Sequence, residues 1–167
     1  MSRRTMFFLR NLTVLVTTVL LAGCASLSPF STITKLNLTL TATDQLNPDL
    51  NGRPSPVVVR LFELKHPVAF ENADFFSLYE RARETLSPDL VSSEELELRP
   101  GETIELRLGI VGGGHYVGVL AAYRDLPQTR WRYTLPLAAA QVTEVNLTLD
   151  QEGIASTFEK TAKVDDR

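Results

Sequence analysis

Apolar and polar residues alternate with a period of two along most of this 167-residue chain. A period of two is the repeat of a β-strand, because successive side chains of a strand point to opposite faces. The alternation, together with two more apolar runs, predicts strands near residues 36–42, 56–65, 94–98, 103–110, 115–123, 131–137, 145–149 and 154–158. Turn signals separate these runs, as at Asn51-Gly52, Pro100-Gly101 and Gly153. This spacing of strands predicts an all-β sandwich of two sheets.

One segment departs from the period of two. In residues 71–86, ENADFFSLYERARETL, apolar side chains recur at helical spacing, namely Phe75, Leu78, Tyr79, Ala82 and Leu86. This spacing is typical of an amphipathic helix. Asn72 or Asp74 is expected to cap its start, and Ser87-Pro88 to end it. We therefore expect a helical insertion whose apolar face packs onto the sandwich rather than onto a partner.

The N-terminus has the features of a secretory signal peptide. The first ten residues hold three arginines and no acid, and residues 12–23 are apolar apart from three threonines. The apolar run is shorter than the roughly 20 residues of a membrane-spanning helix. It ends at the single cysteine of the chain, Cys24. A lone cysteine is also compatible with a buried structural role or a spare thiol.

The stretch Leu21-Ala22-Gly23-Cys24 resembles the lipobox of bacterial lipoproteins. The resemblance implies that residues 1–23 are removed as a signal peptide and that Cys24 carries lipid (a diacylglyceryl thioether and an acylated amino group, such as palmitate). Three acyl chains would make attachment effectively permanent, since two signals already suffice for stable anchoring. Ala25 and Ser26, in place of an Asp after the cysteine, imply the outer membrane. Residues 24–32 are then a lipidated tether.

The chain that remains after removal of residues 1–23 has 144 residues and no free cysteine. This length suits one domain, expected at 33–160 with a tail at 161–167, and no disulfide stabilises it. The whole chain has a formal net charge of −3, and loss of the three N-terminal arginines leaves −6. An acidic domain with scattered cations gives no reason to expect nucleic acid as a partner.

Catalytic and metal-binding signals are weak. The two histidines, His66 and His115, have no ligand partners at metal-binding spacing. The triplet Gly112–Gly114 leads into a predicted strand, whereas phosphate-binding glycine loops lead into a helix. A Ser-His-Asp triad needs no adjacency in sequence and stays open, but no nucleophile-elbow motif is present. We expect no enzyme activity, no metal, no cofactor beyond the lipid and no small-molecule substrate.

The longest irregular stretch is residues 43–56, TDQLNPDLNGRPSP, between the first two strong strands. Loops are common places for function, and prolines stiffen a loop before it binds. We expect Leu46 and Leu50 to be exposed there. Either the loop folds against its own domain or it contacts a partner, and the sequence pattern alone favours neither.

An ordered series of blocks resembles the outer-membrane lipoprotein family of the type VI secretion system, TssJ (also VasD or SciN). The blocks are the lipobox, residues 46–65, 70–90, 98–102 and 116–132. The resemblance implies a transthyretin-like sandwich that faces the periplasm, is not an enzyme, and anchors the secretion complex by binding the periplasmic C-terminal region of the inner-membrane protein TssM. By position, the implied contact residues are Leu46, Asn47, Pro48, Asp49, Leu50, Asn51, Gly52, Arg53 and Pro54.

Two other functions stay open. A periplasm-facing lipoprotein that binds a small ligand would use the same sandwich. A transthyretin-like hydrolase would need histidines and arginines gathered in one pocket, and the chain has only two histidines.

Overall fold

A computed structural model describes residues 33–110 and 113–163. The predicted signal peptide 1–23, Cys24 and the tether 24–32 lie outside the described residues.

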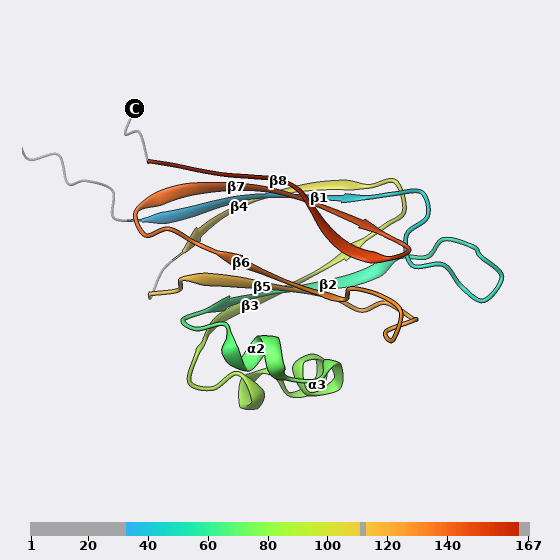
Figure 1. Cartoon of the computed structure of the whole chain (residues 1–167), viewed down its shortest axis with the longest axis horizontal. Helices are drawn as coiled ribbons and strands as arrows, with labels where there is room; N and C mark the ends of the chain where they lie inside the picture. The colour runs from blue at the N-terminus through green and yellow to red at the C-terminus, as the bar shows by residue number, and fades with distance from the viewer. Residues whose placement is uncertain (1–32, 111–112, 164–167) are drawn as a thin grey trace, which may run out of the picture. The chain divides into compact units, whose positions relative to one another are not determined.

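The strands form two sheets of four strands each (Figure 1). The first sheet has the order β4-β1-β7-β8, with β4 at Thr103–Ile110, β1 at Thr34–Ala42, β7 at Gln141–Asp150 and β8 at Gly153–Lys163. The second has the order β3-β2-β5-β6, with β3 at Leu90–Leu98, β2 at Val57–Leu64, β5 at Tyr116–Ala121 and β6 at Arg132–Pro136. Neighbours are antiparallel except β1 and β7, which are parallel. The predicted two-sheet sandwich is confirmed.

The core lies between the two sheets. Leu38 of β1 is paired with Leu106 of β4 and Val145 of β7, so alternate side chains of three strands share the inner face. Across from them, Val59, Val119 and Leu135 of the second sheet are fully buried. Burial of each such side chain contributes about 1.5–3 kcal/mol relative to exposure. The period of two in the sequence therefore arises because every second side chain of these strands lies on the buried inner face.

Two short helices replace the single helix predicted at 71–86. They are α2, Val68–Asn72, and α3, Phe75–Thr85. The chain is extended at Ala73 and Asp74, and the Asp74 carboxylate accepts a hydrogen bond from the Ser77 N–H at 3.0 Å. An Asp at this position satisfies a free N–H of the first turn and starts a new helix. Asp74, one of the two expected caps, begins α3, and the five apolar residues of the predicted stripe all lie after it. The extension of that helix back to residue 71 was wrong.

Both helices cover the outer face of the second sheet (Figure 1). A second apolar layer forms there from Phe62, Leu64, Phe70, Leu78, Leu86 and Leu120. It explains why β2 and β5 are apolar on both faces. Phe75, Tyr79 and Ala82 pack against this layer, so the helical stripe packs onto the sandwich as expected.

Several strands are longer than their patterns indicated; β7, for example, begins at Gln141 rather than at 145. β3 begins at Leu90 rather than near 94, and β8 continues to Lys163, three residues into the segment 161–167 expected as a tail. Within the described ranges, no helix has the length and apolar character needed to cross a membrane.

Candidate functional site

The β1–β2 loop, residues 43–56, extends beyond the sheets at one end of the sandwich (Figure 1). Its tip is closed by Asp49. One carboxylate oxygen, Oδ1, accepts hydrogen bonds from the N–H of Asn51 at 2.8 Å and of Arg53 at 2.9 Å. The other, Oδ2, accepts from Arg53 Nε at 2.8 Å. The Asp49 N–H in turn donates to the Arg53 carbonyl at 2.8 Å, so residues 49–53 form a closed turn.

These contacts favour the charged form of Asp49. The hydrogen bond from the Arg53 backbone lowers the pKa of the Asp49 carboxyl below its usual value of 3.8. Desolvation, the second-largest effect, raises the pKa, while hydrogen bonds from the Arg53 side chain and the Asn51 backbone lower it further. A carboxylate that accepts several N–H bonds is stabilised as the anion. The loop tip is therefore held closed at neutral pH.

Leu46 is buried, contrary to expectation. Its side chain has no exposed surface and belongs to the core cluster, while its carbonyl accepts from the Ser55 N–H at 3.0 Å. The expectation was wrong because an apolar residue in a loop was placed in water, whereas here the chain folds back and inserts Leu46 into the end of the sandwich. Leu50 differs, since it is fully exposed as predicted, with a relative accessibility of 106%.

Asn47 joins this loop to a second one. It is 4% exposed and has a positive φ of 44°, a conformation that Asn tolerates better than most residues. Its Nδ2 donates to the Pro56 carbonyl at 2.9 Å, and its Oδ1 accepts from the Arg124 N–H at 2.9 Å. Arg124 belongs to the β5–β6 loop, residues 122–131. Both polar ends of one buried amide therefore fix the relative position of the two loops.

A groove of about 490 Å³ lies between these loops and the β7–β8 turn. It is lined by Asn47, Pro48, Asp49, Leu50, Tyr123, Arg124, Asp125, Gln128, Thr129 and Gln151. Tyr123 is almost fully buried at its base, and its hydroxyl has no hydrogen-bond partner among the described residues. Burial, with the nearby Asp150 carboxylate, raises the pKa of Tyr123 well above its usual value, so the phenol stays neutral.

The structure divides the predicted contact residues into three groups. Leu46 is in the core and Asn47 is a buried bridge, whereas Pro48, Asp49 and Leu50 line the groove. The remaining ones, Asn51, Gly52, Arg53 and Pro54, are exposed along the outer part of the loop. Sequence reasoning missed the β5–β6 contribution. The turn-forming segment Asp125-Leu126-Pro127 signalled a loop, but nothing in the sequence indicated which loop it would meet.

The histidines lie away from this groove. The His66 ring follows β2 and its Nδ1 is 2.8 Å from Asp89 Oδ1. The His115 backbone precedes β5 and donates to the Leu64 carbonyl at the same end of β2 as His66. Within residues 33–110 and 113–163, no group of three or more His, Cys, Asp or Glu side chains is placed to hold a metal ion.

Comparison with known families gives a match over residues 34–152, to the type VI secretion lipoprotein family that includes VasD, EvfM and TssJ. The chain belongs to this family. Membership confirms the resemblance inferred from the ordered sequence blocks.

Solved structures agree with this TssJ-family assignment. The type VI secretion lipoprotein TssJ1 from Pseudomonas aeruginosa matches with a TM-score of 0.73 and 33% identity, covering 80% of this chain and 99% of that one. Serratia marcescens Lip, a membrane-bound component of the type VI secretion system, matches with a TM-score of 0.71 and 27% identity, covering 75% and 98%. The comparison with curated proteins found no match.

A third structure shows the TssJ-type fold at greater sequence distance. A chain in the structure described as the TssM C-terminal domain from EAEC matches with a TM-score of 0.63 and 23% identity, covering 75% of this chain and 99% of that one. At this identity the likeness concerns the fold alone.

Proposed function

We propose that this TssJ-family lipoprotein anchors the type VI secretion membrane complex in the outer membrane. The lipid on Cys24 holds the chain in the membrane with its domain in the periplasm, and residues 24–32 act as the tether. The domain binds the periplasmic C-terminal region of a TssM-like inner-membrane protein and has no enzymatic role. The binding surface is the loop end of the sandwich, formed by the exposed residues of the β1–β2 loop and the adjoining groove.

The observation that carries this proposal is the complete exposure of Leu50 on a rigid loop. A leucine in water gains about 1.5–3 kcal/mol on burial, so a partner surface that covers it gains affinity. The turn closed by Asp49 and the bridge made by Asn47 reduce the conformational entropy that the loop loses on binding. An apolar side chain presented on an already ordered loop is what a docking site requires.

Polar groups beside Leu50 are suited to fix the orientation of a partner. The Arg53 side chain is 76% exposed although its guanidinium is paired with Asp49. Arg124, Asp125 and Gln128 are exposed on the facing loop. Exposed charges of both signs around an apolar contact favour specificity and association rate more than affinity.

The test is the affinity of this chain, purified from membranes in detergent, for the periplasmic region of the TssM-like protein of the same host. Leu50→Ala should weaken binding about tenfold, since loss of a covered leucine at an interface costs about 1.5 kcal/mol. Val68→Ala is the matched control, because Val68 is 63% exposed on α2, away from the loop end. Equal losses in both variants, or none in Leu50→Ala, would move the interface elsewhere. A folded wild type that fails to bind would overturn the proposal.

Ligand binding is the second candidate, and the groove is the observation that favours it. A volume of about 490 Å³ lies within the range of small-molecule sites. A saturable thermal shift with a small molecule, abolished by filling the groove with Gln128→Trp, would support this function. Binding of the TssM-like protein without any such shift would favour anchoring.

A further inference from the structure

β6 is an edge strand whose outer side is open. It is the last strand of its sheet and spans only Arg132–Pro136. The Trp131 carbonyl accepts from the Ala121 N–H, and the Leu137 N–H donates to the His115 carbonyl, both at 2.8 Å. Since backbone groups alternate sides along a strand, odd-numbered residues bond β5, while Arg132 and Thr134 direct their N–H and C=O groups away from it.

β8 closes this side at one point. The Arg130 N–H donates to the Glu152 carbonyl and the Arg130 carbonyl accepts from the Ile154 N–H, both at 2.9 Å. In the part of the chain that the structure describes, Arg130 and Gly153 form the one isolated bridge, and the backbone groups of Arg132 and Thr134 have no partner on the open side. Open edge groups are a template for another strand.

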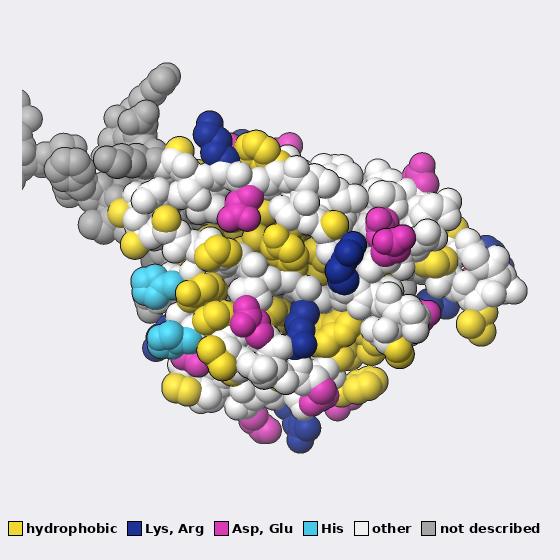
Figure 2. Space-filling view, in the orientation of Figure 1, with side chains coloured by type: hydrophobic (Ala, Val, Ile, Leu, Met, Phe, Trp, Pro, Cys, Tyr) yellow, Lys and Arg dark blue, Asp and Glu magenta, His cyan; other side chains and the backbone are white. Residues whose placement is uncertain are grey.

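A hollow of about 460 Å³ lies beside this open edge. It is lined by Thr129, Arg130, Trp131, Arg132, Tyr133, Ile154 and Ala155. Figure 2 shows apolar side chains gathered on this face between the helices and β6. An added strand would place every second side chain toward this hollow, where Trp131 and Tyr133 offer aromatic contacts.

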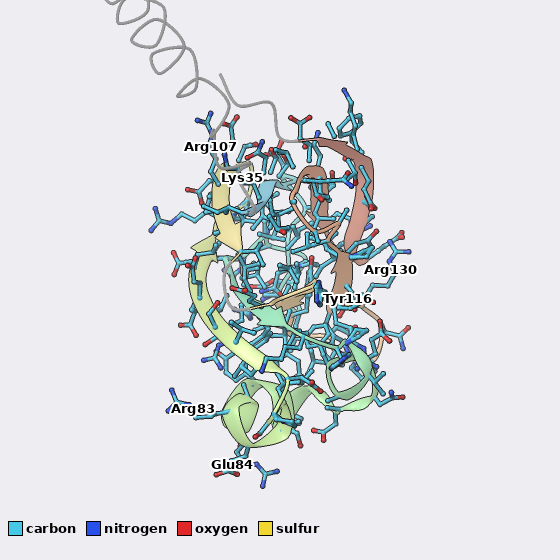
Figure 3. The ribbon with its side chains drawn as sticks, turned by 90° about the vertical axis from the view of Figure 1, so that its left-hand side faces the viewer. Lys35, Arg83, Glu84, Arg107, Tyr116 and Arg130 are labelled. Carbon is cyan, nitrogen blue, oxygen red and sulfur yellow. The ribbon has the colours of Figure 1, made fainter. Side chains whose placement is uncertain are left out.

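The charge of the β6 edge indicates which kind of partner strand could pair with it. Residues 130–136, RWRYTLP, hold two arginines and no acid in an acidic chain. β3, the opposite edge of the same sheet, holds Glu94, Glu95 and Glu97. Figure 3 shows the Arg130 side chain directed outward. An acidic extended segment is therefore complementary to β6 and is repelled by β3.

We propose that an extended, acidic segment of the partner adds to the sandwich as a strand along β6. The segment pairs with the backbone of Arg132 and Thr134, places an apolar side chain in the hollow and a carboxylate near Arg130. This inference rests on the proposed function. Thr129 lines both the hollow and the loop-end groove, so one partner that covers Leu50 reaches β6 without leaving the surface.

Thr134→Pro tests the pairing. Proline removes the N–H that the added strand would use and is tolerated on the open side of an edge strand, because Thr134 makes no ladder bond to β5. Thr134→Ala is the control, since it removes the side chain and keeps the N–H. With the periplasmic region of the TssM-like protein as probe, Thr134→Pro should weaken binding about tenfold and Thr134→Ala less than twofold.

Hydrogen exchange of the wild-type complex gives a second measurement that does not depend on how a variant folds. Peptides that cover residues 131–136 should become protected when the partner binds, while peptides from β3 should not change. Binding without this protection, and with full affinity in Thr134→Pro, would overturn the strand addition and leave the proposed anchoring intact. A folded wild type that does not bind the partner would overturn both.

Discussion

At the scale of single residues, Asn47 connects two loops that are far apart in the sequence. Its buried amide bonds Pro56 on one side and Arg124 on the other. Asn47→Ala leaves the part-buried Pro56 carbonyl and Arg124 N–H without these partners, and it places a less tolerant residue at a positive φ. We expect a loss of about 2 kcal/mol in the free energy of unfolding, measured by urea denaturation.

Asn51→Ala is the control for this prediction. Asn51 lies on the same loop and is exposed, with only its backbone N–H bonded to Asp49. It should change the free energy of unfolding by less than about 0.5 kcal/mol. Equal effects of the two substitutions would show that Asn47 does not connect the loops in the way described.

The closed tip of the β1–β2 loop should depend on pH. Because the folded-state pKa of Asp49 is lowered, its stabilisation is fully present above the unfolded value of 3.8 and is lost as the pH falls through the lower folded value. The amide of Arg53 should therefore exchange slowly near neutral pH and become faster below about pH 4, after correction for intrinsic rates. In Asp49→Asn this added acid-dependent step should be absent. If exchange in the wild type instead became faster at a higher pH, the Asp49 carboxylate would not be what holds the turn of residues 49–53 closed.

At the scale of elements, the contact between α2 and β5 depends on a glycine. A Cβ at Gly118 would lie 2.9 Å from ring atoms of Phe70, which is fully buried and packs against Phe62 with ring centroids 5.8 Å apart and ring planes tilted by 52°. Gly118→Ala should lower the free energy of unfolding by about 1–3 kcal/mol, because the ring has no free space to move into.

Gly109→Ala is the matched control, since the nearest atom to its Cβ would be 3.9 Å away, on Ile33. Alanine in this strand should be neutral or slightly stabilising. Urea denaturation measures both variants. A Gly118→Ala protein as stable as the wild type would mean that α2 is displaced from β5 at little cost.

The strands themselves were largely predictable from the sequence, but the sequence did not show which strands and loops would lie next to one another. Each expected strand is present because its inner face is buried, and burial leaves a period of two in the sequence. The helix α2 was not predicted, since its five residues are too few to show a helical repeat, whereas α3 begins after Asp74, one of the two expected caps. The extra length of β3 was hidden because Ser92 and Ser93 carry no apolar signal.

The loop-end site also could be predicted from the sequence only in part. Leu50 and Arg53 are exposed as a loop sequence suggests, but the burial of Leu46 depends on the space that both sheets leave at the end of the core. The contact between Asn47 and Arg124 joins residues 77 positions apart. A pattern of local propensities holds no information on such a pair, so the second half of the groove required the fold.

At the scale of the whole molecule, the described domain is stabilised without a disulfide. The single cysteine of the chain is Cys24, outside the described residues. Stability comes instead from two apolar layers, one between the sheets and one beneath the helices. A domain that folds by its core alone leaves the cysteine available for lipid, and the proposed anchor and the docking surface are then separate parts.

The separation of anchor and docking surface is tested most directly by Cys24→Ser. The measurement is membrane fractionation of cells that express this variant or the wild type, with the TssM-like protein followed in a co-purification from each fraction. The proposed function predicts that the variant is folded, binds the TssM-like protein as tightly as the wild type, and is lost from the outer-membrane fraction, so that secretion fails. A Cys24→Ser chain that stays in the outer membrane, or that supports normal secretion, would contradict it.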